Sequence, residues 1–195
     1  MIGLAAPGAA PRGQDGGGLP LREPLRNFQR RLADRLQAAS DEAVKAAWLA
    51  VEAGGAHYLL PLAQAGEIFP AALPHPVPYT QSWFLGVASL RGTLYAVADL
   101  AGLVDRNRDG RVVPLGPRPQ AQWVTLNTCL EVQCALQVDR LAGLRSAEAF
   151  APPQAADDAA PAWWGGTYLD PSGIRWQALD LLALSQEPDF LRIGR

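Results

Sequence analysis

The chain of 195 residues carries 17 basic and 19 acidic residues, which gives a formal net charge of −2, and 49% of its residues are hydrophobic. This balance gives no electrostatic reason to expect nucleic acid or an anionic membrane as a partner. No apolar run approaches the ~20 residues that a membrane-spanning helix needs, so we expect no direct membrane insertion. The hydrophobic content is enough for one domain with a substantial core and appendages.

The N-terminal part of the chain is expected to lie outside that domain. Residues 1–20 are rich in Gly, Ala and Pro, which predicts a flexible tail, and they lack the pattern of a signal peptide. Residues 21–46 are expected to form an amphipathic helical extension, because apolar residues recur at steps of three and four: Leu21, Leu25, Phe28, Leu32 and Leu36. A helix packed on the domain surface and a partner-docking or membrane-surface helix both fit this pattern.

Short strands are expected from Trp48 onward. The segments WLAVE and AHYLLPL flank the small residues AGG, which predicts a hairpin, and AGEIF follows as a further strand. After a proline-rich loop comes GVASLRGTLYAVADL, residues 86–100, in which Arg91 and Gly92 stand between two apolar runs. We expect these runs to be two strands joined by a turn at that pair.

The second half of the chain is also expected to consist of short strands joined by turns. A polar stretch, DRNRDGRVVPLGPRPQ, begins like a calcium-binding EF-hand loop, but its twelfth position is Gly116 where a glutamate is needed. The segments AQWVTLNT and VQCALQVDRLAGL are expected to pair as two strands through a turn near Leu130 and Glu131. GGTYLD and IRWQALDLLAL form a last hairpin, turning at residues 171–173 and ending in a short helix. Such short strands favour an all-β barrel or sandwich.

No residue pattern in the sequence indicates a catalytic or metal-binding site. His57 and His75 have no serine or cysteine nucleophile at a recognised spacing. Cys129 and Cys134 form a lone C-x4-C pair, which is a poor zinc spacing and predicts two reduced, packed thiols. We therefore expect a protein that is not an enzyme and has no catalytic residue, no cofactor and no metal ligand.

Residues 86–100 resemble the CheW family of chemotaxis coupling proteins. The family signature is a G-V-x-N-L-R-G turn followed by a strand that ends P-[VI]-[VI]-D-L. The matching positions are Gly86, Val87, Leu90, Arg91, Gly92, Val97, Asp99 and Leu100, whereas Ser89, Ala96 and Ala98 depart from the signature. Upstream, AGEIF is similar to the V-x-E-I segment of the family at Glu67 and Ile68.

The likeness spans about residues 47–193, because the strand around VQCALQVDRLAGL and the closing hairpin are also similar to the family. The segment SWFLGVASLRG and the ending EPDFLRI are similar to the PilI-type members, which serve the twitching system of the type IV pilus. The resemblance implies a fold of two small five-stranded, SH3-like β-barrels around a shared hydrophobic core, here with an added N-terminal helix.

The resemblance also implies a function. It predicts a cytoplasmic, non-enzymatic adaptor at receptor arrays, which couples the tip of a methyl-accepting chemoreceptor to the regulatory domain of a CheA-type histidine kinase. The implied receptor-binding residues are Glu67, Ile68, Gly86, Val87 and Arg91, and the implied structural turn residues are Leu90, Gly92 and Asp99. In a PilI-type member the adaptor would control twitching motility.

Residue chemistry alone leaves the role of Arg91 open. With Gly92 at a positive φ, Arg91 would project outward while Leu90 and Leu94 stay in the core. Its guanidinium suits the acids or carbonyls of a helical receptor tip, but it would equally tie down a neighbouring loop or pair with Asp99. Two other functions stay open: a CheW-like modulator that competes with another coupling protein, and an unrelated small β-barrel ligand-binding protein.

Overall fold

A computed structural model describes residues 46–106, 120–155 and 160–194. The predicted tail, the predicted helical extension up to residue 45 and most of the EF-hand-like stretch lie outside these residues; Ala46 already opens the first strand. In the described part of the chain, no helix is long and apolar enough to cross a membrane.

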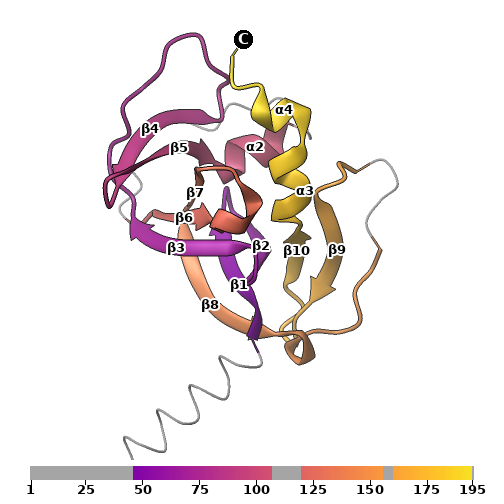
Figure 1. The fold of residues 1–195 in the computed structure, drawn as a ribbon. Helices are drawn as coiled ribbons and strands as arrows, with labels where there is room; N and C mark the ends of the chain where they lie inside the picture. Colours follow the sequence, from indigo (N-terminus) through magenta and orange to yellow (C-terminus); the bar gives the residue numbers. More distant parts are fainter. Residues whose placement is uncertain (1–45, 107–119, 156–159, 195) are drawn as a thin grey trace, which may run out of the picture. The chain divides into compact units, whose positions relative to one another are not determined.

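Ten strands in the described residues form two sheets of five (Figure 1). The first sheet has the order β8-β1-β2-β10-β9 and the second has the order β3-β6-β7-β5-β4. The strands are β1 (Ala46–Ala53), β2 (Ala56–Pro61), β3 (Ala65–Pro70), β4 (Phe84–Leu90), β5 (Thr93–Asp99), β6 (Gln122–Leu126), β7 (Cys134–Val138), β8 (Arg140–Ser146), β9 (Trp164–Leu169) and β10 (Arg175–Leu179).

Short helices complete the fold: α2 (Leu100–Arg106), α3 (Leu181–Gln186), α4 (Pro188–Leu191) and the 3-10 turns Thr128–Leu130 and Ala147–Ala149. Both sheets are mixed, because β10 runs parallel to β2 and β5 runs parallel to β7, while the other neighbours are antiparallel. The prediction of a mainly β fold built from two five-stranded units is confirmed.

The hairpins follow from their turn residues. Gly54 and Gly55 join β1 to β2 with φ of 59° and 76°, and Arg91 and Gly92 join β4 to β5 with φ of 49° and 84°. Two-residue turns with positive φ at both positions match the right-handed twist of paired strands. The predicted β1–β2 and β4–β5 hairpins are therefore confirmed, together with the reason for them.

The closing hairpin β9–β10 is also present, and Asp170 organises its turn. One carboxylate oxygen, Oδ1, accepts hydrogen bonds from the backbone N–H of Ser172 (2.8 Å) and of Ile174 (2.9 Å), and Oδ2 accepts one from the indole of Trp176 (3.2 Å). Partial burial acts to raise the pKa of this carboxyl, but these hydrogen bonds and the charge of Arg145 outweigh it, so the pKa lies below its usual value.

One predicted strand was wrong, and one helix was missed. VQCALQVDRLAGL is two strands, β7 and β8, which belong to different sheets and are separated at Asp139. The backbone N–H of Asp139 donates to Glu52 of β1, which carries the chain across to the first sheet. Helix α2 follows β5 directly, and the sequence pattern did not predict it.

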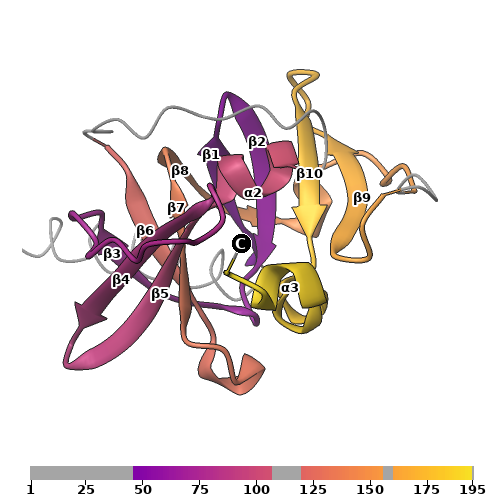
Figure 2. The ribbon, with the colours of Figure 1, turned by 90° about the horizontal axis from the view of Figure 1, so that it is seen from above.

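A single hydrophobic core joins the two sheets. It includes Leu49 and Val51 of β1 together with Val124 of β6 and Leu136 of β7, and the helices α2 and α3 lie between the sheets in Figure 2. Each sheet also has a smaller core of its own on its other face, around Trp176 for the first sheet and around Trp123 for the second. Since side chains alternate along a strand, Leu136 enters the shared core while its neighbour Ala135 enters the smaller one. The core strands are thus apolar on both faces.

Candidate functional site

The candidate binding surface lies where the two edges of the second sheet meet. β3 and β4 are the outer strands of that sheet, yet Arg91 at the end of β4 contacts Glu67 of β3. The Arg91 Nη1 atom lies 2.8 Å from Glu67 Oε2, and the guanidinium carbon lies 5.6 Å from the centre of the Phe69 ring. We call Glu67, Ile68, Phe69 and Arg91 the β3–β4 surface. The contact shows that the sheet curls until its edges approach each other.

Arg91 reaches this position through an unusual backbone. Its φ of 49° is uncommon for a residue with a Cβ, and such conformations cost on the order of 1 kcal/mol or more. Gly92 follows at 84°, and a Cβ there would meet no atom within 4 Å. The turn therefore holds the guanidinium out into solvent, where the side chain of Arg91 is 74% exposed and that of Glu67 is 56% exposed.

One expectation about this turn needs correction, and one alternative left open by the sequence is decided. Leu94 is not in the core: it is 60% exposed, because β5 pairs it with the exposed Ser89 on the solvent face of the hairpin. The ion-pair partner of Arg91 is Glu67, and not Asp99. Leu90 is half-buried and packs against the small core of the second sheet.

A bulge in β3 directs Glu67. The pairing of β3 with β6 shifts register between Ala65 and Ile68, and Thr125 of β6 bridges the irregularity. The Thr125 hydroxyl accepts a hydrogen bond from the Glu67 N–H (2.8 Å) and donates one to the Glu67 carbonyl (3.1 Å). A Cβ on Gly66 would lie 2.5 Å from that hydroxyl oxygen, so glycine is required here. Bulges of this kind re-aim side chains at sheet edges.

Gly86 and Val87 lie farther along β4 and have a different environment. The backbones of His75 and Val87 exchange two hydrogen bonds, of 2.8 and 2.9 Å, which hold the loop after β3 against the strand. Gly86 is buried beneath that loop at a φ of 134°, and a Cβ would lie 2.1 Å from the His75 carbonyl oxygen. Val87 is half-buried against the shared core. The structure therefore gives Gly86 a role in packing, and receptor contact by Gly86 and Val87 stays a prediction.

Two further predicted residues, Ile68 and Asp99, differ in their exposure to solvent. Ile68 is 41% exposed beside Glu67, so the β3–β4 surface combines an ion pair with apolar area. Asp99 is buried at the end of β5, where its N–H donates to the Trp83 carbonyl (2.7 Å) and its carboxylate accepts from the N–H of Gly102 in α2 (3.3 Å). Asp99 thus joins the strand to the helix and lies away from solvent.

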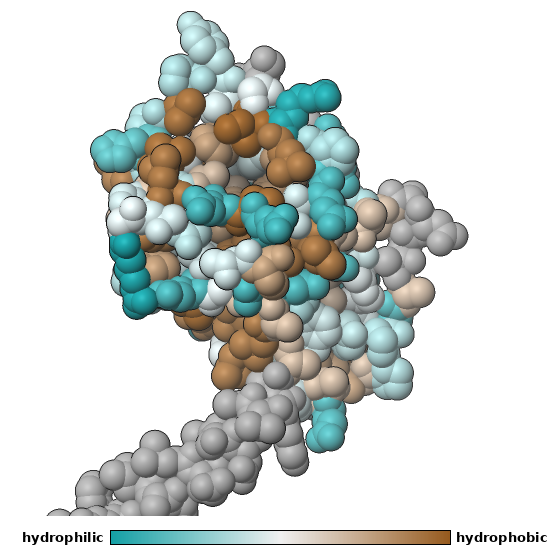
Figure 3. Space-filling model, in the orientation of Figure 1, coloured by the Kyte–Doolittle hydropathy of each residue, from teal (hydrophilic) through white to brown (hydrophobic). Residues whose placement is uncertain are grey.

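A second exposed apolar region lies on the loop between β3 and β4 and on the C-terminal segment. Leu73 and Tyr79 of the loop are 94% and 89% exposed, and Leu191 after α3 is 53% exposed. Hydrogen bonds join the two segments, since the Gln81 N–H donates to the Ile193 carbonyl (2.8 Å). Figure 3 shows hydrophobic side chains among hydrophilic ones over this upper part of the molecule. We call Leu73, Tyr79, Leu191 and Ile193 the loop–tail surface.

The described residues hold no cluster of three or more His, Cys, Asp or Glu that would bind a metal ion. Cys129 is exposed, contrary to the expectation that both thiols are packed, and Cys134 is buried. Burial raises the pKa of the Cys134 thiol to about 12, and this outweighs a backbone hydrogen bond at Ala135 that acts to lower the pKa. Cys134 is therefore a protonated core side chain at neutral pH.

Residues 47–189 match the family model of the CheW-like domain. The chain belongs to the CheW-like family. The resemblance predicted from the sequence is thereby confirmed. CheW-like scaffold proteins are non-enzymatic, and CheW-like domains bind chemoreceptors and the kinase CheA.

Two known proteins are similar to this chain. It is 27% identical over 116 residues to Protein PilI of Pseudomonas aeruginosa, a match that covers 60% of this chain and 61% of that protein. The chain thus spans about three fifths of the length of this curated relative. The crystal structure of the scaffolding protein TtCheW from Thermoanaerobacter tengcongensis superposes with a TM-score of 0.54 at 17% identity, covering 69% of this chain and 88% of that one. At that identity the superposition shows a common fold.

Two residues that form or support the β3–β4 surface were not predicted from the sequence. Phe69 lies under the guanidinium of Arg91, and Thr125 fixes the bulge that presents Glu67. The sequence carried one signal for them: Gly66 precedes Glu67 inside an apolar strand, and an isolated glycine in a strand often marks a bulge. The partner of that bulge, 58 residues away, has no local signal.

Proposed function

We propose that this chain is an adaptor that couples a methyl-accepting chemoreceptor to a CheA-type histidine kinase. Membership of the CheW-like family supports the coupling role. The similarity to Protein PilI supports a chemosensory system of the type IV pilus, in which the adaptor controls twitching motility from cytoplasmic receptor arrays. The same similarity is the reason to prefer the pilus system over a flagellar one.

The observation that carries the proposal is the exposed, conformationally strained Arg91. A turn with positive φ at both central positions favours Asn, Asp or Gly, so arginine at this position costs stability. Its ion pair with Glu67 is largely exposed and is therefore worth about 0–1 kcal/mol at most. Stability does not account for the arginine, whereas its remaining donors, which face solvent, suit the carboxylates and carbonyls of a helical receptor tip.

In this proposal Glu67 orients the guanidinium, and Ile68 adds an apolar contact beside it. Gly86 and Val87 belong to the same site as residues that shape β4, with any direct receptor contact made through the backbone. We further infer that each five-stranded sheet closes into a small SH3-like barrel. The Arg91–Glu67 contact between edge strands and the separate small core of the second sheet support that closure.

An adaptor needs a second surface, and we assign it to the loop–tail surface. Tyr79 has a φ of 60° and an almost fully exposed side chain, which resembles Arg91 in combining strain with exposure. Large exposed apolar side chains such as these are candidates for contact with a partner protein. This surface comes from the loop after β3 and the C-terminal segment, so its use by the kinase regulatory domain would leave Arg91 free for the receptor.

The receptor contact is tested with charge variants at the ion pair. Arg91→Glu, Glu67→Arg and the double exchange are titrated by calorimetry with a purified receptor-tip fragment from the same organism. Loss of one charge-assisted hydrogen bond of about 1.5–3 kcal/mol predicts affinity at least tenfold weaker for Arg91→Glu, with the melting temperature nearly unchanged. The double exchange restores the ion pair but not the binding. Arg175→Glu, an exposed arginine of the first sheet, is the control and binds like the wild type.

Three results would count against this assignment. Full affinity in Arg91→Glu would show that Arg91 is outside the interface. Recovery of affinity by the double exchange would show that the pair serves only to hold β3 against β4. Collapse of the fold in Arg91→Glu would give the residue a structural role alone.

A further inference from the structure

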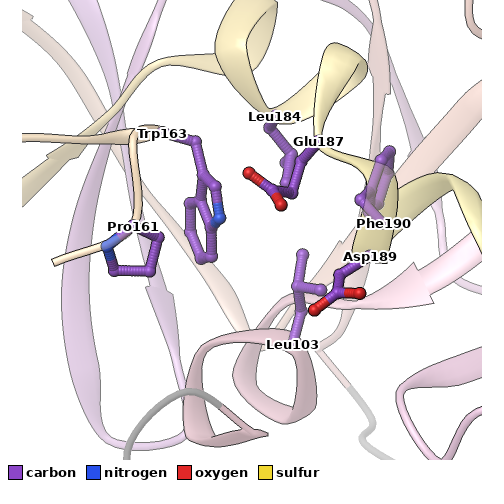
Figure 4. A pocket seen from close by; sticks show the side chains of 7 residues that line it. All are labelled: Leu103, Pro161, Trp163, Leu184, Glu187, Asp189 and Phe190. Carbon is purple, nitrogen blue, oxygen red and sulfur yellow. The ribbon is translucent and has the colours of Figure 1, made fainter.

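A small pocket opens beside the C-terminal helices, and none of its lining residues belongs to the β3–β4 surface or the loop–tail surface. Its volume is about 120 Å³. Figure 4 shows side chains from α2, from the segment before β9 and from α3 and α4 converging on it. The residues used below are Leu103, Trp163, Leu184, Glu187, Asp189 and Phe190.

The apolar walls of the pocket are fixed by packing. Leu103, Leu184 and Phe190 are buried members of the shared core. The Phe190 ring stacks on Trp83 with centroids 5.7 Å apart and an interplanar angle of 18°. Helix α3 is capped by the Asp180 carboxylate, which accepts from the N–H groups of its first turn. The pocket therefore exists before any ligand arrives.

Two polar groups face the pocket and have no hydrogen-bond or ion-pair partner among the described residues. Trp163 is only 1% exposed, and in Figure 4 its indole nitrogen points into the pocket. That N–H donates no hydrogen bond within the part of the chain that the structure describes. An indole N–H is a hydrogen-bond donor only, so it pairs with an acceptor. The pocket therefore suits a ligand that carries a carbonyl or another hydrogen-bond acceptor.

The second group is the carboxylate of Glu187, between α3 and α4. It is half-buried, points into the pocket in Figure 4, and makes no ion pair or side-chain hydrogen bond among the described residues. Asp189 adds a second carboxylate to the same pocket. The Glu187 carboxylate repels an anionic ligand and attracts a cation, so we expect the acceptor for Trp163 to belong to a ligand that is also positively charged.

The volume of the pocket limits which positively charged groups it can hold. Sites for small organic ligands usually measure about 300–1,000 Å³, so a pocket of 120 Å³ takes a single side chain. An arginine fits the chemistry: its planar guanidinium forks onto a carboxylate and stacks on an aromatic ring, and its stem covers apolar surface. We propose that this pocket receives an arginine side chain of a partner protein, with the guanidinium on Glu187, the stem against Phe190 and Leu103, and a peptide carbonyl of the partner on the Trp163 N–H.

The test follows the Trp163 indole signal directly. The full chain, labelled with ¹⁵N-tryptophan, is titrated with N-acetyl-arginine amide, and its six indole signals are assigned by triple-resonance spectra. We expect the Trp163 signal to move with half-saturation on the order of 10 mM, as suits a small fragment. N-acetyl-citrulline amide has the same shape without the charge and is the matched probe. Sodium chloride keeps the ionic strength equal in both titrations.

Glu187→Gln removes the proposed charge from a half-buried position, and we expect at least a fivefold weaker titration. Glu148→Gln, an exposed carboxylate elsewhere in the chain, titrates like the wild type. No movement of the Trp163 signal up to about 100 mM would overturn the proposal, as would equal shifts with citrulline or an unchanged titration in Glu187→Gln. These outcomes do not depend on receptor or kinase binding, so they stand apart from the adaptor proposal.

Discussion

Replacing Gly86 with alanine should break the contact that holds the loop after β3 onto the second sheet. The new Cβ would lie 2.1 Å from the His75 carbonyl oxygen and 2.7 Å from its carbonyl carbon, far inside van der Waals contact. The backbone cannot absorb this overlap by a rotamer change, because both atoms belong to main chain. Either the loop moves away from β4 or the strand shifts, and both remove the His75–Val87 bridge.

The size of the stability loss in Gly86→Ala follows from the hydrogen bonds that it breaks and the backbone strain that it adds. Two backbone hydrogen bonds, of 2.8 and 2.9 Å, contribute about 0.5–1.5 kcal/mol each. A φ of 134° adds on the order of 1–3 kcal/mol of strain for any residue with a Cβ. The expected loss in the free energy of unfolding is therefore about 2–6 kcal/mol, a large share of the 5–15 kcal/mol that stabilises a typical domain.

Urea unfolding followed by tryptophan fluorescence measures this loss, with Gly92→Ala as the matched control. Gly92 also has a positive φ, but a Cβ there meets nothing within 4 Å, so this variant reports the conformational cost alone, about 1 kcal/mol. The difference between the two variants isolates the overlap with His75. Equal losses in both variants, or a wild-type stability for Gly86→Ala, would refute the described packing of the loop against β4.

Two further predictions concern titratable side chains. Because the pKa of Asp170 is lowered in the fold, its ionised form stabilises the protein above about pH 4, and this contribution is lost as the pH falls through the lowered pKa. The melting temperature of Asp170→Asn should therefore lie below that of the wild type at pH 7, and the gap should close below about pH 4; a gap that is constant with pH would contradict this. At pH 8 a thiol reagent should label Cys129 promptly and Cys134 only on unfolding, since Cys134 is buried with a pKa of about 12. Prompt reaction of both thiols would show that the core around Cys134 opens.

The sequence alone predicted the features that depend on residues close together in the chain. The pairs Gly54–Gly55 and Arg91–Gly92 indicated their hairpins, because two-residue turns have strict backbone requirements. The signature around Arg91 and the Glu67–Ile68 pair identified the family, which the family model confirms. The separation of β7 from β8 had no such marker, because apolar residues continue on both sides of Asp139 while the chain crosses between sheets.

The geometry of the candidate site depends on contacts between distant segments. Glu67 and Arg91 meet only because the second sheet curls, and the bulge that presents Glu67 is held by Thr125 from another strand. Leu94 was expected in the core because it is apolar, but the register of the hairpin places it opposite Ser89 in solvent. Register and curvature are set by the packing of whole sheets, so residue type alone does not reveal them.

The most direct test of the central claim asks whether two partners bind at once. The full chain is mixed with the receptor-tip fragment and the kinase regulatory domain from the same organism, and sedimentation velocity measures the masses of the complexes. The adaptor account predicts a ternary complex that loses the receptor fragment in Arg91→Glu and loses the kinase domain in a Leu73→Glu, Tyr79→Glu double variant. Mutually exclusive binding of the two partners would contradict it in favour of a competing modulator, and binding of neither would contradict the coupling function itself.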